Sequence, residues 1–381
     1  MFRVTVLGLG ISASLFFTAC QPQPDTATEN ADLVGSEAPA KEPNSSQAAA
    51  ERVRVVTVPN GGIVPDAEVD SRGVIHLTYF ANNDVWYTSS SDDGQTFRDP
   101  IRVNTEEGFA YGGAFRGPDL AIGKDDRVHI AWYNSAYQQK RPQEEWGVMY
   151  SRLLPNKDRF ETARNLNHKP SDNFSIAADE KGNVSVIWMA GGVFATCSDD
   201  GGDSFSEAKD LQTDPCECCS SRAMFANGTL SVLYRDKAGK DRDIYLASLS
   251  DNGQRFEHTK VSQTPWYIDS CPMTGSFISP AADGIVAAWE TKGEIYYARM
   301  EPSGKLTSAG EILASDQGRY PVTLTAADGV TVVAWKNSEK LEWQLFDSQD
   351  NPTEQRGSKT GTTVDRPAGV VTSDGSFVLF L

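Results

Sequence analysis

Cysteines gather at two places in the chain, and their spacing is suited to metal or redox chemistry. The first place is the run Asp214-Pro215-Cys216-Glu217-Cys218-Cys219, and the second is Cys271-Pro272-Met273. Three thiols within four residues can converge from one loop, and a methionine thioether follows the fourth thiol. Soft sulfur ligands of this kind suit Cu(I) or Zn(II). The candidate metal ligands are therefore Cys216, Cys218, Cys219, Cys271 and Met273.

The same cysteines also fit a disulfide. A bond from Cys216, Cys218 or Cys219 to Cys271 would stabilise a secreted protein by about 2–4 kcal/mol. A redox-active or catalytic thiol is a third interpretation. Two of the six cysteines lie outside these clusters, Cys20 near the N-terminus and Cys197, which fits a small buried residue beside a turn. The residue types and their spacing leave disulfide and metal both open.

Short apolar strands that repeat along the chain must position these cysteines. A glycine precedes an aromatic residue by six positions at several places: Gly73 to Tyr79, Gly182 to Trp188, Gly228 to Tyr234 and Gly329 to Trp335. A third strand is expected in each of six units: Val85–Ser89, Gly147–Arg152, Val193–Cys197, Ile244–Leu249, Ile295–Met300 and Leu341–Phe346. No sustained helical period appears. Four strands per unit, repeated roughly every 45–55 residues, predict an all-β fold, a β-propeller of four-stranded blades.

The two ends of the repeat region predict how the ring closes. First-and-second strand pairs suggest seven blades, whereas third-and-fourth pairs suggest six. Arg52–Val58 is typical of a fourth strand without a partner, and Pro367–Leu381 is a strand pair at the chain end. We expect these two segments to share one split closing blade, because closure removes free sheet edges. The prediction is a seven-bladed propeller over residues 52–381, with six blades as the alternative.

A turn motif recurs beside the third strands. Ser90–Phe97 and Ser198–Phe205 share a carboxylate, a glycine, a hydroxyl and an aromatic residue, and Leu249–Phe256 is a degraded copy. The carboxylate can accept backbone N–H groups, the glycine can take a positive φ, and the aromatic residue fills the adjoining gap. The key positions are Asp92, Gly94, Phe97, Asp200, Gly202 and Phe205.

These turns resemble the Asp-boxes, or BNR repeats, of sialidase-like propellers. The resemblance implies that the turns are structural and lie on the face opposite the ligand site. The opposite face is the one on which innermost strands begin and second strands lead to third strands. Its candidate ligand-binding residues are Arg116, Arg222, Arg235, Arg319, Arg366, Trp146 and Trp266. Cys216–Cys219 and Cys271 also fall there, before the innermost strands of two adjacent blades.

The sialidase resemblance also implies a catalytic set. A sialidase holds the substrate carboxylate with three arginines and uses a tyrosine nucleophile with a glutamate and an aspartate acid/base. The arginine positions implied here are Arg116, Arg222 or Arg235, and Arg319 or Arg366. Tyr320 with Glu290 would form the nucleophile pair, and Asp119 would be the acid. The competing interpretation is that these residues are rim charges and turn residues.

The N-terminus is similar to that of bacterial lipoproteins. Arg3 precedes an apolar run, and Phe17-Thr18-Ala19-Cys20 resembles a lipobox. The resemblance implies a signal peptide over 1–19, lipidation of Cys20 and an outer-membrane anchor on the periplasmic or surface side of the cell envelope. Residues 20–51 are rich in Ala, Ser, Pro and Gln, which predicts a disordered tether.

The net charge of the chain bears on which kinds of partner it can bind. A value of -17 argues against nucleic acid as a partner. The leading hypothesis is a cell-envelope lipoprotein whose propeller recognises a glycan or small molecule at the axial face. An active exo-glycosidase of the exo-α-sialidase kind is the second hypothesis, and a scaffold for protein partners is the third. Copper or zinc at the cysteines is the candidate cofactor.

Overall fold

Seven β-sheets make up the part of the chain that the structure describes. The computed structural model describes residues 52–381 except 114, 156–157, 251–254, 283, 309–310, 314–316 and 362–364, and the side chains of 311–313. The predicted signal peptide, Cys20 and the tether lie outside the described residues. The sheets follow one another as blades, which confirms the all-β, seven-bladed propeller.

Each of the first six blades has four main strands, numbered outward from the propeller axis. The innermost strands are β2 (Ile63–Val69), β7 (Asp119–Gly123), β11 (Asp172–Ala178), β15 (Arg222–Ala226), β19 (Ser276–Ala281), β23 (Gly318–Thr325) and β27 (Ala368–Val371). The second strands are β3 (Ile75–Ala81), β8 (Arg127–Asn134), β12 (Val184–Met189), β16 (Thr229–Arg235), β20 (Gly284–Thr291), β24 (Thr331–Asn337) and β28 (Phe377–Phe380).

The fourth strands vary most in length, from two residues in β5 to nine in β26. Third strands are β4 (Asp84–Ser90), β9 (Val148–Arg152), β13 (Val193–Ser198), β17 (Ile244–Ser250), β21 (Glu294–Met300) and β25 (Lys340–Phe346). Fourth strands are β5 (Ile101–Arg102), β10 (Arg164–Asn165), β14 (Lys209–Asp210), β18 (Arg255–Lys260), β22 (Glu311–Leu313) and β26 (Pro352–Thr360). An additional strand, β6 (Ala110–Tyr111), pairs with β8. Three short 3₁₀ turns complete the set: η1 (Pro59–Gly61), η2 (Lys124–Asp126) and η3 (Gln143–Glu145).

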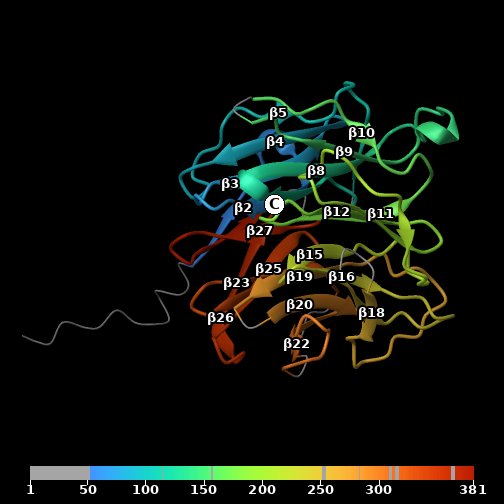
Figure 1. Ribbon diagram of the computed structural model, residues 1–381. Helices are drawn as coiled ribbons and strands as arrows, with labels where there is room; N and C mark the ends of the chain where they lie inside the picture. Colours follow the sequence, from blue (N-terminus) through green and yellow to red (C-terminus); the bar gives the residue numbers. More distant parts are fainter. Residues whose placement is uncertain are drawn as a thin grey trace, which may run out of the picture. The chain divides into compact units, whose positions relative to one another are not determined.

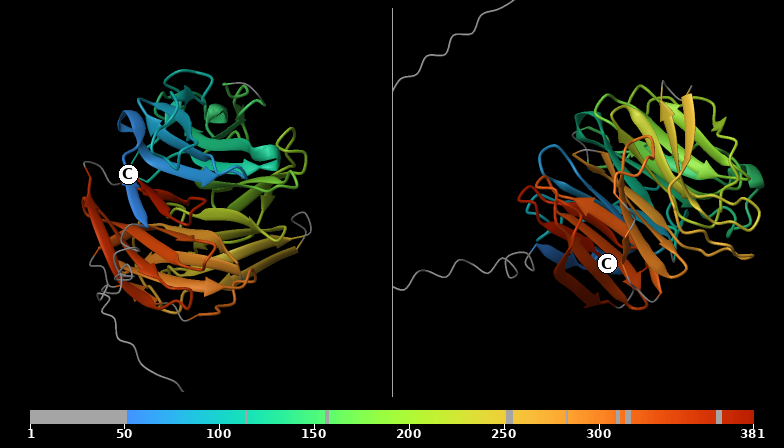
Figure 2. Two further views of the ribbon diagram at one scale, coloured as in Figure 1. Left: turned by 90° about the vertical axis from the view of Figure 1, so that its left-hand side faces the viewer. Right: turned by 90° about the horizontal axis from the view of Figure 1, so that it is seen from below.

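The innermost strands form a closed ring. Each packs against the innermost strand of the next blade, and β27 returns to β2. Figure 1 shows the blades in sequence order, from the blue first blade to the red strands beside it, and Figure 2 gives two further views of them. Consecutive strands within the first six blades are antiparallel, so all innermost strands begin on one face. We call this the axial face and the opposite one the turn face.

The closing blade differs from the others in the strand that follows its second strand. Strand β1 (Val53–Val56) pairs with β28 in parallel, from Val53 opposite Phe377 to Val56 opposite Phe380. The shared closing blade is confirmed, but it has three strands, and β1 is the outermost of them, directly beside the second strand β28. It keeps the direction of a fourth strand because it must end on the axial face, where β2 begins. With no third strand between them, it pairs directly with β28.

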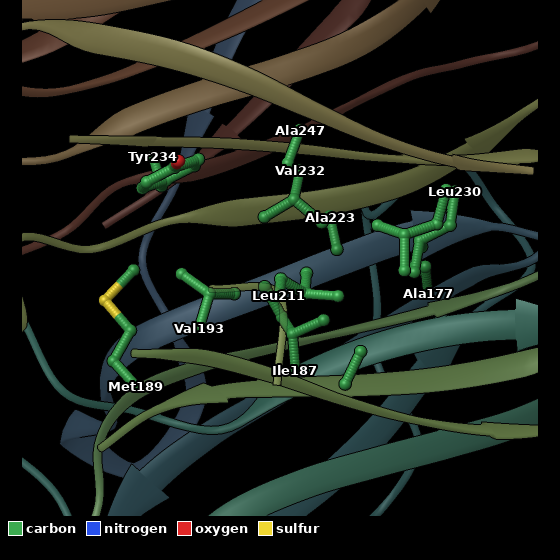
Figure 3. Packing of buried hydrophobic residues seen from close by; sticks show 12 residues of the cluster. Ala177, Ile187, Met189, Val193, Leu211, Ala223, Leu230, Val232, Tyr234 and Ala247 are labelled. Atoms are coloured by element: carbon green, nitrogen blue, oxygen red, sulfur yellow. The ribbon is translucent and has the colours of Figure 1, made fainter. Parts of the chain in front are cut away.

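Apolar side chains fill the spaces between blades. Figure 3 shows the cluster between blades 3 and 4, where Ile187 and Val193 approach Val232 and Ala223. Strand β12 is buried along its whole length, as expected of a strand covered on both faces. The aromatic residues six positions after the glycines are almost fully buried: Tyr79, Trp188, Tyr234 and Trp335. They are therefore core residues.

Candidate functional site

The recurring Asp turns use their polar atoms internally. Asp92 Oδ1 accepts hydrogen bonds from the Ser90 hydroxyl at 2.6 Å and the Thr96 N–H at 2.9 Å, and Oδ2 accepts the Thr96 hydroxyl at 2.6 Å. Gly94 has φ 75°, and its N–H donates to Ser90 Oγ. These bonds, led by the Ser90 hydroxyl, hold the pKa of Asp92 well below its usual range. The turn is therefore a self-contained structural element.

The second turn repeats this arrangement. Asp200 accepts both the Ser204 hydroxyl and the Ser204 N–H, and Gly202 again has a positive φ of 82°. Phe205 packs edge-on against Tyr150 at 5.0 Å, as Phe97 does against Phe380 at 6.1 Å. A pocket of about 360 Å³ adjoins this turn. Residues 251–254 of the degraded third copy lie outside the described residues.

Charged residues of four blades meet inside the channel near the axial face. Arg222 Nη1 donates to Asp66 Oδ2 at 2.7 Å, and its Nη2 lies 3.5 Å from Glu68. Arg366 donates to Asp119 Oδ1 at 2.7 Å. Asp66 also accepts the Leu120 N–H, which ties blade 1 to blade 2. Arg222 and Arg366 are thus engaged by carboxylates of the protein itself.

Burial raises the pKa values of two acids in this channel network. Desolvation raises the pKa of Asp66, although Arg222 opposes the shift. Desolvation likewise raises the pKa of Glu68 to about 7. Glu68 lines a cavity of about 300 Å³ toward the middle of the channel. The network therefore carries one carboxyl group that can titrate near neutral pH.

Arg116 and Tyr320 lie next to the channel network but are also occupied. Arg116 makes a two-pronged contact with Asp172, through Nε at 2.8 Å and Nη2 at 2.7 Å. The Tyr320 hydroxyl donates to the Met273 carbonyl at 2.7 Å, and its ring stacks on Phe115. Burial raises the pKa of Tyr320 to about 12. Among the described hydrogen bonds, none joins Tyr320 to Glu290, the partner expected from the sialidase resemblance.

The four cysteines of the two sequence clusters converge on the axial face. Their sulfur atoms all lie within 4.8 Å of one another. Cys218 and Cys271 form a disulfide, and Cys216 and Cys219 are free thiols whose sulfurs are 3.2 Å apart. The Cys216 sulfur lies 3.7 Å from Cys218 and 4.0 Å from Cys271. We call Cys216, Cys218, Cys219 and Cys271 the cysteine group.

Backbone contacts hold the cysteine group in place. The Cys216 N–H donates to the Arg235 carbonyl at 2.8 Å, and the Ser220 N–H donates to the Thr274 carbonyl at 3.0 Å. The second bond fastens the loop before β15 to the loop before β19. Burial alone would raise the pKa of Cys219, but its contact with Cys216 and the charge of Arg235 lower it to about 7.

A pocket of about 480 Å³ opens beside the cysteine group. It contains several of the sequence-predicted residues: Trp266, Glu290, Arg319 and Cys271. Arg319 is exposed, and within the described residues no carboxylate lies within 4.0 Å of its guanidinium. The Glu290 carboxylate is buried and accepts the Gly293 N–H at 2.5 Å. We call this the blade 5–6 pocket, because its walls come from β20, β24 and the loops around them.

Two predicted residues have local packing roles. The Arg235 guanidinium lies 4.8 Å from the centre of the Trp266 ring and donates to the carbonyls of Arg242 and Glu290. Trp146 packs within its own loop, edge-on to Tyr137 at 4.8 Å, and donates to the Arg141 carbonyl. Arg235 is thus a buried neighbour of the pocket, and Trp146 is a loop residue.

Several site residues were not predicted from the sequence. They are Asp66, Glu68, Asp172, Arg242 and Lys336. Asp66, Asp119 and Arg222 occupy comparable places in their innermost strands, opposite Thr78, Ala131 and Leu233. Aligning the innermost strands by this register would have placed Asp66 beside Asp119 and Arg222. Lys336 directly follows Trp335, one residue beyond the glycine-to-aromatic spacing.

Comparisons with known proteins establish the fold. No protein-family model matches the chain, and no curated protein matches it. Among solved structures, a Hadza microbial sialidase is similar over 72% of this chain, with 12% identity and a TM-score of 0.50. The chain spans 63% of the length of that sialidase.

Two further solved structures have the same kind of likeness. A six-bladed fungal lectin from Aleuria aurantia has 11% identity and a TM-score of 0.47, with 77% of this chain and 93% of the lectin covered. An ulvan lyase of a polysaccharide lyase family has 13% identity and a TM-score of 0.48, with 82% of this chain and 88% of the lyase covered. In fold, the described part of this chain is a sialidase-like β-propeller.

Proposed function

We propose that the protein is a cell-envelope lipoprotein whose propeller binds a glycan or a small glycan-like ligand in the blade 5–6 pocket. The observation that carries the proposal is the lining of this pocket. Trp266 is a half-buried indole beside the exposed guanidinium of Arg319 and the amine of Lys336. An aromatic face suits the apolar side of a sugar ring, and cations suit its carboxylate or sulfate groups. Lectin and sialidase propellers of this fold support a glycan as the ligand class.

Binding is favoured over glycoside hydrolysis by the state of the arginines. Arg116, Arg222 and Arg366 are each paired with a carboxylate of the protein. A substrate carboxylate would have to displace these partners. The Tyr320 hydroxyl is likewise bonded to a backbone carbonyl. Among the described residues, Arg319 of the blade 5–6 pocket has no such competitor, whereas Lys336 Nζ lies 3.8 Å from Asp365 Oδ1.

A glycan array followed by calorimetry tests the binding proposal. Acidic and neutral glycans are screened with the whole protein, and a hit is titrated against Trp266→Ala and Arg319→Gln. Each variant should weaken binding at least about tenfold, because a stacking or charged contact is worth roughly 1–3 kcal/mol. Trp146→Ala is the matched control and should bind as the parent does. Equal binding by all four proteins would place the ligand elsewhere and refute the proposal.

Two separate assays test the remaining parts of the proposal. Fluorogenic sialosides should not be turned over between pH 4 and 8, whereas turnover abolished by Tyr320→Phe would establish the hydrolase instead. Labelled fatty acid should be incorporated into the parent protein and not into Cys20→Ser. Retention of the label by Cys20→Ser would contradict lipidation at that residue.

A further inference from the structure

The spacing of the Cys216 sulfur from the other three sulfurs of the cysteine group is close to that of a tetrahedral metal site. A Zn–S bond of about 2.3 Å implies sulfurs roughly 3.8 Å apart at the corners of a tetrahedron. Cys216 lies 3.2, 3.7 and 4.0 Å from the sulfurs of Cys219, Cys218 and Cys271. Once the Cys218–Cys271 bond is reduced and its two sulfurs move apart, one metal ion could contact all four sulfurs, which lie within 4.8 Å of one another. A single disulfide uses only two of the four sulfurs and does not explain why the other two converge.

Two buried arginines beside the cysteine group supply an independent observation. Arg235 is 1% exposed and Arg242 is 7% exposed. Their terminal nitrogens donate to backbone carbonyls, and the Nε atom of each has no hydrogen-bond partner. Across the described ranges, no carboxylate lies within 4.0 Å of either guanidinium. Buried charges without a counter-charge cost several kcal/mol.

A thiolate centre would provide the missing negative charge. The charges of Arg235 and Arg242 act on Cys216, and that of Arg235 acts also on Cys219. Zinc with four thiolates carries a net charge of about −2, which two guanidinium groups balance. A disulfide with two neutral thiols carries no charge and leaves both arginines uncompensated. Two buried acids lie nearby, but Glu290 accepts the Gly293 N–H and Asp243 is paired with Lys260.

We propose that the reduced cysteine group binds one thiol-seeking d¹⁰ cation, Zn(II) or Cu(I), in a tetrahedral site of Cys216, Cys218, Cys219 and Cys271. The charge balance favours Zn(II). Binding of Zn(II) to the four thiols releases four protons and transfers no electrons. The site deepens the proposed function, because Cys271 also lines the blade 5–6 pocket. The metal would fasten the pocket wall between blades 4 and 5.

The disulfide form and the metal form are alternatives for the same residues. Joining Cys218 to Cys271 removes two protons and two electrons and requires an external oxidant. A phosphine reductant reverses this: the phosphine becomes its oxide, water supplies the oxygen, and two thiols return. The metal-binding experiment therefore uses the whole protein after phosphine reduction without oxygen.

Cobalt(II) is the first probe, because its colour reports coordination directly. Reduced protein titrated with Co(II) should show the intense visible bands of a tetrahedral site and sulfur-to-metal absorption, saturating at one equivalent. Zn(II) and Cu(I) are then added separately, and each should displace the cobalt. A pale octahedral spectrum in the folded, fully reduced protein would overturn the proposal without any mutation.

Variants then test the ligands. Cys219→Ser should lower Zn(II) affinity by more than about 100-fold, and Arg235→Met should lower it by about tenfold through lost charge balance. Cys197→Ser is the matched control, since Cys197 lies on β13 and hydrogen-bonds with Ser185. Circular dichroism confirms that each variant is folded. Equal zinc content in Cys219→Ser and Cys197→Ser would refute the site.

This experiment is separate from the test of the proposed function. Protein that takes up zinc but binds no glycan would contradict the proposed function alone. Protein that binds a glycan but takes up no zinc after reduction would contradict the metal site alone. If protein isolated anaerobically from cells holds the Cys218–Cys271 disulfide in full and takes up no metal after reduction, the cysteine group is a disulfide clamp.

Discussion

Replacing Arg222 tests whether the channel charges hold the ring together. Arg222 is 7% exposed and reaches from blade 4 to Asp66 on blade 1, 156 residues away in sequence. Its Nη1 also lies 4.0 Å from Asp119, and its guanidinium lies 4.9 Å from the Phe277 ring. Arg222→Met keeps most of the side-chain volume but leaves the buried Asp66 carboxylate without the cation that donates to it, whereas Asp119 keeps Arg366. Breaking a buried pair from one side costs about 3–5 kcal/mol.

The assay is urea unfolding followed by tryptophan fluorescence, arranged as a double-mutant cycle. Arg222→Met, Asp66→Asn and the double variant are compared with the parent. The double variant should lose less stability than the two single losses added together, because it leaves neither charge unpaired. Arg255→Met is the control, since Arg255 is exposed and pairs only with Glu257 among the described residues. We expect it to cost less than about 1 kcal/mol.

Acidity provides a second readout for Arg222→Met. Without Arg222, protonation of the buried acids removes the free-energy penalty of burying an unpaired carboxylate. The loss of stability should therefore be larger at pH 8 than at pH 5. A loss no greater than that of Arg255→Met at both pH values, with additive cycle energies, would refute the role of Arg222 as the cation that holds the channel acids.

Three other predictions concern separate parts of the propeller. The pKa of Glu68 is raised to about 7, so the unfolding free energy should fall as pH rises from about 4.5 through 7. In Glu68→Gln this fall should be smaller by on the order of 1 kcal/mol, measured by urea unfolding at several pH values. Asp92→Ala should lower the urea midpoint because several turn donors lose their acceptor, whereas Asp99→Ala, an exposed neighbour, should leave the midpoint almost unchanged. Deleting residues 52–58 should remove about 3 kcal/mol and expose β28 to association, and a monomer of unchanged stability by gel filtration and denaturation would contradict the closing role of β1.

The fold could be predicted from the sequence because its determinants are local. The spacing from Gly182 to Trp188 reports one turn and one strand, and the same spacing recurs in other blades. Local patterns also placed Arg52–Val58 in the closing blade. They could not show its parallel pairing with β28, because that depends on a missing third strand and on where β2 begins.

The charge network of the channel could be predicted only in part. Arg222 and Arg366 were placed on the correct face by topology, yet their partners come from blades 1 and 2. A side chain on the inner ring can reach across to any other blade, so sequence distance carries no information about pairing. The cysteine group was accessible to sequence reasoning because its members precede the innermost strands of adjacent blades. Which bonds those sulfurs form depends on redox state and on neighbouring charge.

The distribution of unmatched charge shifts the candidate site away from the propeller axis. Inside the channel, Arg222 pairs with Asp66 and Arg366 pairs with Asp119, so the charges at the centre connect different blades. Near blades 4 to 6, by contrast, Arg235, Arg242 and Arg319 have no carboxylate partner within 4.0 Å among the described residues. A buried cation without a counter-charge favours binding of a group that supplies one, and an exposed cation is available to an acidic ligand. A thiolate metal centre suits the two buried arginines, and an acidic group on a glycan suits exposed Arg319.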